Sequence, residues 1–213
     1  MRYIIGIDEV GRGSLAGPVT VAALALLAGG PTSKISRAPV SGGRTSKNLK
    51  LRDSKKLSPK QREVWFAYIK NHPQIFYVTA HVQPSVIDRI NITKAANLAA
   101  SRALHKLATS HLPPVNKKKT KIFLDGGLYA RPFPKLLLAN GYSLKTVIRG
   151  DEKIPAIALA SIVAKVTRDK LMKRLSKKFP KYGFAFHKGY GTRAHFAAVK
   201  KFGPSSKHRL TFL

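Results

Sequence analysis

Four acidic residues follow segments that the sequence predicts as β-strands. Asp8 ends the β-rich segment 3–8 with Glu9 beside it, Asp125 ends segment 121–125, and Asp151 follows segment 144–148. Loops at strand ends often assemble functional sites. Clustered carboxylates repel one another unless cations lie between them, and hard oxygen ligands suit Mg²⁺ or Mn²⁺. Two such ions can activate water and stabilise the leaving oxygen of a phosphodiester, so the pattern favours a metal site. Taken singly, each acid could equally cap a turn or pair with a lysine.

Asp8 and Glu9 pose a geometric problem, because neighbouring residues on a regular strand point to opposite faces. We therefore expect them to share a site only if the strand ends or bulges between them. The nearby Gly11 and Gly13 are compatible with such an irregularity.

The charge of the chain predicts a polyanionic partner. Forty Lys and Arg stand against nine Asp and Glu, giving a formal net charge of +31. Such a field attracts nucleic acid and speeds encounter with it. Charge alone fits a non-catalytic RNA- or DNA-binding protein equally well, and a ribosome-associated one in particular. An anionic membrane surface fits less well, because no cationic amphipathic helix with a bulky apolar face is apparent.

Two further segments carry residues suited to a nucleic-acid ligand. Gly11-Arg12-Gly13 combines a cation with small residues that let backbone amides approach a ligand, although a simple turn has the same composition. The segment 182–193 mixes aromatic and basic side chains, which suits stacking on sugars or bases beside phosphate contacts. A surface loop pinned to the core by aromatic residues is the alternative for this segment.

The remaining elements alternate in a way that predicts a single α/β domain over residues 1–213. Strands are expected at 3–8, 19–27, 75–82, 121–125 and 144–148. Helices are expected at 59–71 and 155–178 and, after a cap at Thr192, to about Phe202, with a helical region over 84–110. Residues 28–50 are rich in Gly, Ser, Pro and cations and are interpreted as a basic loop insertion. The chain has no cysteine, which excludes disulfides and thiolate metal sites. No stretch is long enough to span a membrane and no signal peptide is apparent, so a cytoplasmic location is expected.

The order of the motifs resembles that of bacterial ribonuclease HII along nearly the whole chain. The matching blocks are Gly6-Ile7-Asp8-Glu9-Val10-Gly11-Arg12-Gly13, Asp53-Ser54-Lys55-Lys56-Leu57-Ser58, Ile87-Asp88-Arg89-Ile90-Asn91-Ile92, Leu124-Asp125-Gly126, Gly150-Asp151, residues 160–169, Tyr182-Gly183, His187-Lys188-Gly189-Tyr190-Gly191-Thr192, His195 and His208-Arg209. Several blocks in one order are far more specific than any single motif.

The resemblance implies a ribonuclease H-like fold: a mixed sheet flanked by helices, with a helical C-terminal extension over about residues 180–213 that binds substrate. It implies a metal-dependent endoribonuclease that cuts the RNA strand of RNA–DNA hybrids. It also implies cutting 5′ of ribonucleotides embedded in duplex DNA, leaving 3′-hydroxyl and 5′-phosphate ends. The expected cofactors are two Mg²⁺ or Mn²⁺ ions, and the expected state is a monomer.

By motif position, the metal-binding acids correspond to Asp8, Glu9, Asp125 and Asp151. The expected arrangement has Asp8 bridging both ions, Glu9 and Asp125 on one ion and Asp151 on the other. The loop Gly11-Arg12-Gly13 corresponds to the family's sensor of the ribose 2′-hydroxyl, the group that separates RNA from DNA at one position.

Tyr190 corresponds to the family's tyrosine that packs on the adjoining deoxyribose. Lys55, Lys56 and Lys188 are candidate phosphate contacts, with a solvated cationic surface as the alternative. Two features depart from the family: the long basic segment 28–50 and the extreme charge. A sister nuclease of the HIII type is a further alternative, although that type usually carries an additional N-terminal domain.

Overall fold

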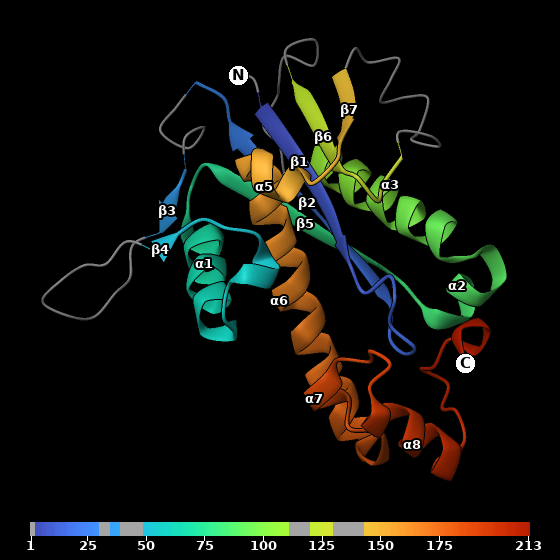
Figure 1. Ribbon diagram of the computed structural model, residues 1–213. Helices are drawn as coiled ribbons and strands as arrows, with labels where there is room; N and C mark the ends of the chain where they lie inside the picture. The colour runs from blue at the N-terminus through green and yellow to red at the C-terminus, as the bar shows by residue number, and fades with distance from the viewer. Residues whose placement is uncertain (1–2, 30–34, 39–48, 111–119, 130–142) are drawn as a thin grey trace, which may run out of the picture.

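A five-stranded mixed sheet forms the centre of the protein (Figure 1). The computed structural model describes residues 3–29, 35–38, 49–110, 120–129 and 143–213. The strands are β1 (Tyr3–Val10), β2 (Val19–Leu27), β5 (Ile75–Val82), β6 (Lys121–Asp125) and β7 (Ser143–Val147), in the order β5-β2-β1-β6-β7. β2 is antiparallel to both β1 and β5, whereas β1, β6 and β7 run parallel. The carboxyl ends of β1, β6 and β7 therefore meet at one edge, where the predicted acids stand.

Helices cover both faces of the sheet because its strands alternate between two apolar cores. Ile5 and Ile7 face a core shared with α2 (Pro84–Ile90) and α3 (Ile92–Ser110). Ala22 and Leu24 face a second core with α1 (Pro59–Asn71) and α6 (Pro155–Lys178). α6 crosses β1 so closely that a Cβ on Gly6 would lie 2.2 Å from the carbonyl carbon of Ala156. This close packing fixes α6 directly over the strand that carries Asp8.

The predicted strands and three of the predicted helices are confirmed to within two residues. Ser58 caps α1 in a capping box with Gln61, and Thr192 caps α8 (Arg193–Phe202), as their sequence positions predict. The helical region expected over 84–110 is confirmed, and it consists of two helices, because the helical geometry is interrupted at Asn91 between α2 and α3. Asn91 there has φ +66°, and its side-chain oxygen accepts from the backbone N–H of Lys94. An asparagine tolerates the left-handed region and can start the next helix at the same position.

The segment 28–50 was expected to be an irregular loop, but part of it is ordered. β3 (Arg37–Ala38) and β4 (Leu49–Lys50) form a short antiparallel ladder, and Ile35 and Ala38 are buried in the core beside α1 and α6. Residues 30–34 and 39–48 of the predicted loop lie outside the described part of the chain.

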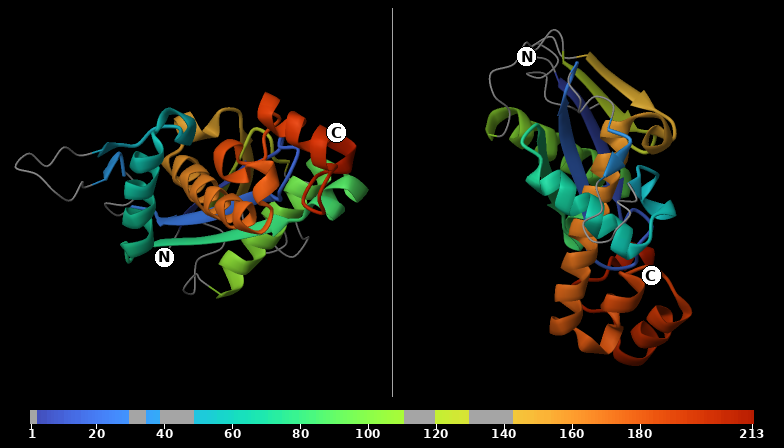
Figure 2. Two further views of the ribbon diagram at one scale, coloured as in Figure 1. Left: turned by 90° about the horizontal axis from the view of Figure 1, so that it is seen from below. Right: turned by 90° about the vertical axis from the view of Figure 1, so that its left-hand side faces the viewer.

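The C-terminal elements extend beyond the sheet at the far end of α6 (Figure 2). They are η4 (Pro180–Tyr182), α7 (Phe184–His187), α8 and η5 (Leu210–Phe212), and they pack on Ala16 and Met172 through Tyr182 and Phe184. The helical C-terminal extension is thus present, with more order than the predicted aromatic loop and irregular tail. Among the described residues, no helix is both long and apolar enough to span a bilayer.

Candidate active site

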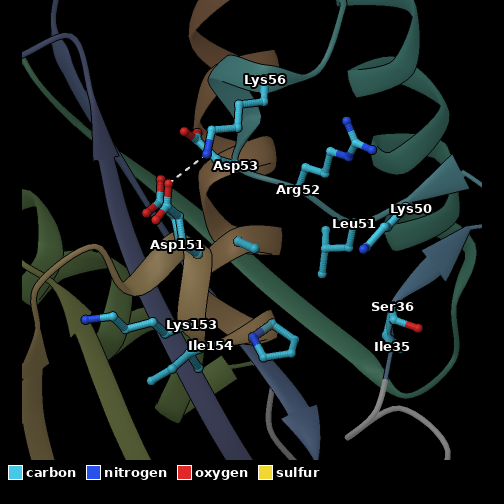
Figure 3. A pocket seen from close by; sticks show the side chains of 13 residues that line it. Ile35, Ser36, Lys50, Leu51, Arg52, Asp53, Lys56, Asp151, Lys153 and Ile154 are labelled. Carbon is cyan, nitrogen blue, oxygen red and sulfur yellow. Dashed lines mark hydrogen bonds and ion pairs between the residues drawn. The ribbon is translucent and has the colours of Figure 1, made fainter.

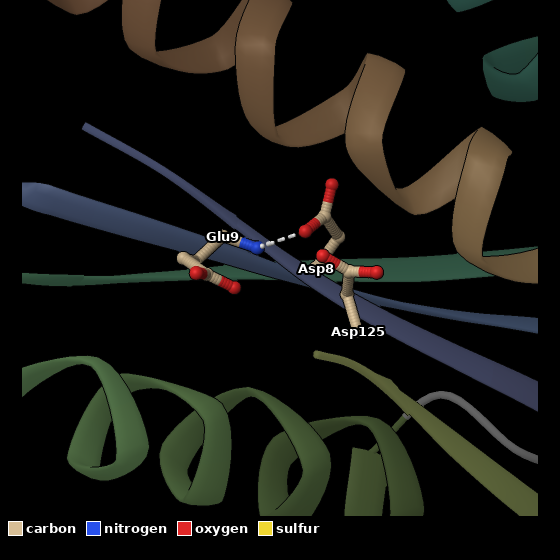
Figure 4. Close-up of side chains that lie close together, drawn as sticks. All are labelled: Asp8, Glu9 and Asp125. Atoms are coloured by element: carbon tan, nitrogen blue, oxygen red, sulfur yellow. Dashed lines mark hydrogen bonds between the residues drawn. The ribbon is translucent and has the colours of Figure 1, made fainter. Parts of the chain in front are cut away.

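Three of the four predicted acids come together at the carboxyl ends of β1 and β6. Asp8, Glu9 and Asp125 each offer a carboxylate oxygen, and these oxygens lie within 4.8 Å of one another (Figure 4). Asp8 is buried and the other two are half-buried. The cluster is therefore a set of hard oxygen donors withdrawn from bulk water.

The strand neither ends nor bulges between Asp8 and Glu9, contrary to the sequence-based expectation. Pairing with β2 continues through both residues to Val10, but the parallel ladder with β6 stops at Ile7 opposite Leu124. Beyond that point, no strand of the described part of the chain pairs with this edge of β1. The backbone N–H of Glu9 donates to Oδ1 of Asp8 at 2.8 Å, so the Asp8 carboxylate folds along this edge. Side chains from opposite faces can thus meet around the edge.

Asp8 lies in an environment that penalises its negative charge. Burial raises its pKa well above the usual range, and repulsion from Glu9 and Asp125 adds to this rise. A hydrogen bond with Ser161 of α6 lowers the pKa in part. Ser161 is itself held by the hydroxyl of Ser54 at 2.8 Å. Desolvation and like charge act together here, and a cation placed among the carboxylates would relieve both.

Glu9 has a buried oxygen with no protein partner in the described part of the chain, Oε2. Burial also raises the pKa of Glu9, against the attraction of Arg12, whose Nη1 lies 3.6 Å from Oε1. On the other side, a Cβ on Gly127 would lie 2.3 Å from Oε1. Gly127 therefore provides the space that this carboxylate occupies, a role that no sequence pattern predicts.

Asp151 lies outside this group of three and beside a different acid. It sits in the one-turn helix α5 (Gly150–Lys153), whose first N–H donates to Oδ1 of Asp125 at 2.8 Å. Burial raises the pKa of Asp151, and Asp53 contributes through repulsion and a shared hydrogen bond, with a further contribution from Asp125. Asp53 and Asp151 line one end of a cavity of about 500 Å³ between α5 and the β3–β4 ladder (Figure 3). Asp53 was not among the predicted site residues, although it begins the second motif block.

The three candidate phosphate-binding lysines differ in their surroundings. Lys55 is exposed, and its charge lowers the pKa values of both Glu9 and Asp151. Lys56 forms an ion pair with Glu152 at 2.8 Å. Lys188 has φ +52° and donates to the carbonyl oxygen of Ala185. Lys55 is thus the lysine of the three best placed to meet a phosphate at the carboxylates.

The loop Gly11-Arg12-Gly13 is held by the buried Arg209 and lies against the buried Arg168, neither of which was among the predicted site residues. Arg209 donates to the carbonyl oxygens of Gly11 and Arg12 at 2.7 and 2.6 Å. A Cβ on Gly11, whose φ is +88°, would lie 2.3 Å from Nε of Arg168. The Arg12 side chain donates to the carbonyl oxygen of Gly127 at 2.7 Å rather than extending into solvent.

Tyr190 lies next to this loop in space. Its backbone forms an isolated antiparallel bridge with Ser14, and its ring, with 36% of the residue exposed, lies 5.5 Å from the guanidinium carbon of Arg168. The structure therefore brings the two predicted substrate-binding segments, 11–13 and 190, close together, and Arg12 of the first lies beside Glu9 of the carboxylate cluster.

The donor set fits a divalent metal ion. It contains only carboxylate oxygens, one of them buried and unpartnered, and the pKa values of Asp8 and Glu9 are raised. Mg²⁺ and Mn²⁺ prefer such hard oxygen ligands. A mixed sheet with this cluster at its strand ends belongs to the class of metal-dependent, ribonuclease H-like phosphodiester hydrolases.

Comparison with known proteins gives the family. Residues 5–213 match the ribonuclease HII family. Ribonuclease HII of Pelagibacter ubique is 39% identical over 212 residues, which cover 100% of this chain and 96% of that protein. The chain belongs to the ribonuclease HII family, and it is a metal-dependent endoribonuclease that acts on the RNA of RNA–DNA hybrids.

Solved structures share the fold at lower identity. The ribonuclease H2 of Pyrococcus horikoshii OT3 superposes with a TM-score of 0.69 at 22% identity, covering 98% of this chain and 93% of that one. Bst-RNase HIII, solved in complex with Mn²⁺, gives a TM-score of 0.61 at 18% identity, with 99% of this chain and 67% of that one covered.

Proposed function

We propose that this protein cuts the RNA strand of RNA–DNA hybrids and also cuts 5′ of single ribonucleotides embedded in duplex DNA. The products carry 3′-hydroxyl and 5′-phosphate ends, and two divalent ions, Mg²⁺ or Mn²⁺, take part. The observation that carries the proposal is the buried Oε2 of Glu9, which has no hydrogen-bond partner among the described residues and lies beside the carboxylates of Asp8 and Asp125. A buried carboxylate oxygen without a hydrogen-bond donor is costly unless a cation binds it.

Asp8, Glu9 and Asp125 form an inner group of acids, and Asp53 and Asp151 form an outer pair. Asp8, Glu9 and Asp125 would hold one ion and Asp151 the other, with Asp8 as a ligand of both. The position of Asp151 outside the inner group supports its assignment to a separate ion. Bound there, divalent ions supply Lewis-acid chemistry that activates water as the nucleophile and stabilises the leaving oxygen.

The protein's own groups position the scissile phosphate. Ser161 and the backbone N–H of Glu9 orient the Asp8 carboxylate, and the N–H of Gly150 orients that of Asp125. Lys55, close enough to affect Glu9 and Asp151, is suited to contact a phosphate oxygen. Fixed donors and charges of this kind favour the transition state because they need little reorganisation.

Recognition of a single ribonucleotide is assigned to the loop 11–13 and to Tyr190. The Arg12 guanidinium is engaged by Gly127, so the loop backbone is the part suited to test the 2′-hydroxyl. Tyr190 packs on the adjoining deoxyribose. Residues 180–213 accordingly act as a substrate-binding extension of one domain spanning 1–213, and we further propose a cytoplasmic monomer.

The test uses a labelled DNA duplex that contains one ribonucleotide. With Mg²⁺ or Mn²⁺ we expect a single cut 5′ of the ribonucleotide, abolished by chelator and by Asp8→Asn. Matched substrates with four ribonucleotides and with none separate the two activities. Cleavage of the longer RNA tract alone would refute the single-ribonucleotide part, and cleavage that persists in chelator would refute the metal mechanism.

A further inference from the structure

The backbone of Tyr190 is held by a chain of buried imidazoles in the C-terminal extension. Its carbonyl oxygen accepts from the N–H of Thr192 at 2.8 Å and lies 3.0 Å from Nδ1 of His195. Nε2 of His195 lies 3.0 Å from Nε2 of His208. Both imidazoles are buried, with 0% and 3% of the residue exposed.

The partners at the two ends of this chain fix where each proton lies. The backbone N–H of Ser205 donates to Nδ1 of His208 at 2.9 Å, so the proton of neutral His208 is on Nε2. The carbonyl oxygen of Tyr190 can only accept, so the proton of neutral His195 is on Nδ1. His208 Nε2–H then donates to His195 Nε2, and His195 Nδ1–H donates to Tyr190. The hydrogen bonds therefore run from His208 through His195 to Tyr190, and all of them can form only while both rings are neutral.

A metal site is excluded as an explanation of these histidines. The third member, His187, stacks on His195 with ring centroids 4.2 Å apart. Its Nδ1 accepts from the N–H of Gly189, and its Nε2 lies 2.7 Å from the carbonyl oxygen of Tyr182. Every ring nitrogen of the three histidines thus already has a hydrogen-bond partner, so none offers a free lone pair to a cation.

The segment that supplies His208 also holds the other substrate-binding loop. The backbone of His208 forms an isolated antiparallel β-bridge with Ala16, and the N–H of Arg209 donates to the carbonyl oxygen of Leu15. The Arg209 side chain donates to the carbonyl oxygens of Gly11 and Arg12. Two adjacent residues therefore connect to two sites: Arg209 to the loop 11–13, and His208 through His195 to Tyr190.

We infer that His195 and His208 are positioning residues that set Tyr190 in register with the loop 11–13. The inference rests on the proposed function, since it takes Tyr190 as the residue that packs on the deoxyribose. Neither histidine touches substrate; they act on the tyrosine through its backbone. The consequence is a preference for a ribonucleotide followed by deoxyribose over a continuous RNA tract.

The first test compares two substitutions of the same ring. His195→Phe keeps an aromatic ring against His187 but removes the donor to Tyr190, whereas His195→Asn keeps an N–H near the position of Nδ1. We expect His195→Phe to lower kcat/KM about tenfold on the single-ribonucleotide duplex and less on a continuous hybrid. His195→Asn should recover most of the loss. Equal losses on both substrates by a folded His195→Phe protein would overturn the inference, because a general loss of stability acts on both alike.

The second test does not depend on activity. ¹⁵N NMR of the imidazoles in the wild-type protein, at pH 7.5 and without substrate or metal, should show His195 protonated on Nδ1 and His208 on Nε2. The reverse tautomer at either ring would overturn the inference. Tyr190→Ala, assayed on the same two substrates, tests the proposed contact of Tyr190 with the deoxyribose separately from the role of the histidines. An unchanged substrate preference would refute that contact, whereas the tautomers test the hydrogen bonds between the histidines and Tyr190.

Discussion

The carbonyl oxygen of Arg12 accepts a hydrogen bond from Nη1 of Arg209 at 2.6 Å, across 197 residues of sequence. Arg209 is completely buried, and its other donors bind the carbonyl oxygens of Gly11 and Gly17. No carboxylate within salt-bridge distance neutralises it in the described part of the chain. A buried cation satisfied by backbone carbonyls fixes backbone geometry, and here the backbone is the loop expected to contact the ribose.

Arg209→Lys tests this relationship. Lysine has one nitrogen and cannot reach three carbonyl groups in the same geometry. We expect a loss of about 3 kcal/mol in the free energy of unfolding, the order of magnitude for buried hydrogen bonds to a charged group. Urea denaturation measures it, and Arg102→Lys on the exposed surface of α3 is the matched control. A loss no larger than that of the control would contradict the finding.

The strands, most of the helices and the positions of the acids at strand ends could be predicted because these depend on local patterns. Four acids were expected to cluster, and three of them come together. Alternating or continuous apolar runs identify strands, and Asp8 and Asp125 directly follow such runs. The position of Asp53 beside Asp151 depends on how the turn after β4 packs on α5, and no local sequence pattern predicts this packing. The meeting of Asp8 and Glu9 depends on where the β1–β6 ladder stops, and that is a property of strand pairing.

The C-terminal contacts were hidden for the same reason. His195, His208 and Arg209 occur in the family's motif blocks, so their positions carried a signal. Apart from the contact between the two imidazoles and the contacts of His208 with Ser205, their hydrogen-bond partners are backbone atoms of residues 11–17 and 190, and backbone atoms leave no trace in composition. The interruption of the helical region at Asn91 has no signal in the apolar periodicity, because the apolar face continues across it, while the left-handed turn depends on one asparagine.

Asp8→Asn should raise stability in chelator while abolishing activity. The pKa of Asp8 is raised in the folded protein, so its contribution to stability is full below the unfolded pKa and is lost as the pH rises through the folded value. At pH 8, far above the unfolded pKa of a carboxyl group, Asp8 therefore no longer makes this contribution without metal. We expect a gain of about 1–2 kcal/mol, a smaller stabilisation by Mn²⁺ than in the wild type, and cleavage lower by about a thousandfold. Thermal unfolding with and without Mn²⁺ measures the first two. A variant less stable than the wild type in chelator would argue against charge repulsion at the site.

Gly127→Ala should weaken metal binding without altering any carboxylate. The added Cβ would lie 2.3 Å from Oε1 of Glu9 and 3.3 Å from Nη1 of Arg12, so Glu9 must shift. We expect the affinity for Mn²⁺ to fall about tenfold, a loss of the size seen when groups that orient metal ligands are changed. Gly13→Ala is the control for metal binding, since nothing lies within 4 Å of a Cβ there. Isothermal titration of both variants with Mn²⁺ gives the comparison, and equal affinities would mean that Glu9 does not bind the ion.

The basic segment between β3 and β4 should add non-specific affinity for duplexes. Deleting 28–50 would remove the buried Ile35 and Ala38, so substitution of charge is the cleaner test. Arg44→Gln with Lys47→Gln should lower duplex affinity and reduce the slope of log K against log salt by up to about 2. Fluorescence anisotropy across a salt series measures both quantities. Superimposable salt dependences of variant and wild type would remove this segment from the binding surface.

Mild acid should release the C-terminal extension before the sheet unfolds. Burial lowers the pKa of His187 and His208, and that of His195 to about 4. Repulsion from Lys188 lowers the pKa of His187, and repulsion from the other two histidines lowers that of His195. The ring of Tyr182 packs against that of His208, with the two ring centroids 4.8 Å apart. For groups with depressed folded pKa values, the stabilisation is present above the unfolded pKa of about 6.5 and is lost as the pH falls toward the folded value.

Between pH 6.5 and 4 we expect the amides of α8 and Tyr190 to lose protection from hydrogen exchange while those of β1 and β2 keep theirs. His208→Gln, which removes one titrating ring but keeps a side-chain donor, should flatten this dependence. Simultaneous loss of protection in α8 and β1 would show instead that acid unfolds the protein as one unit.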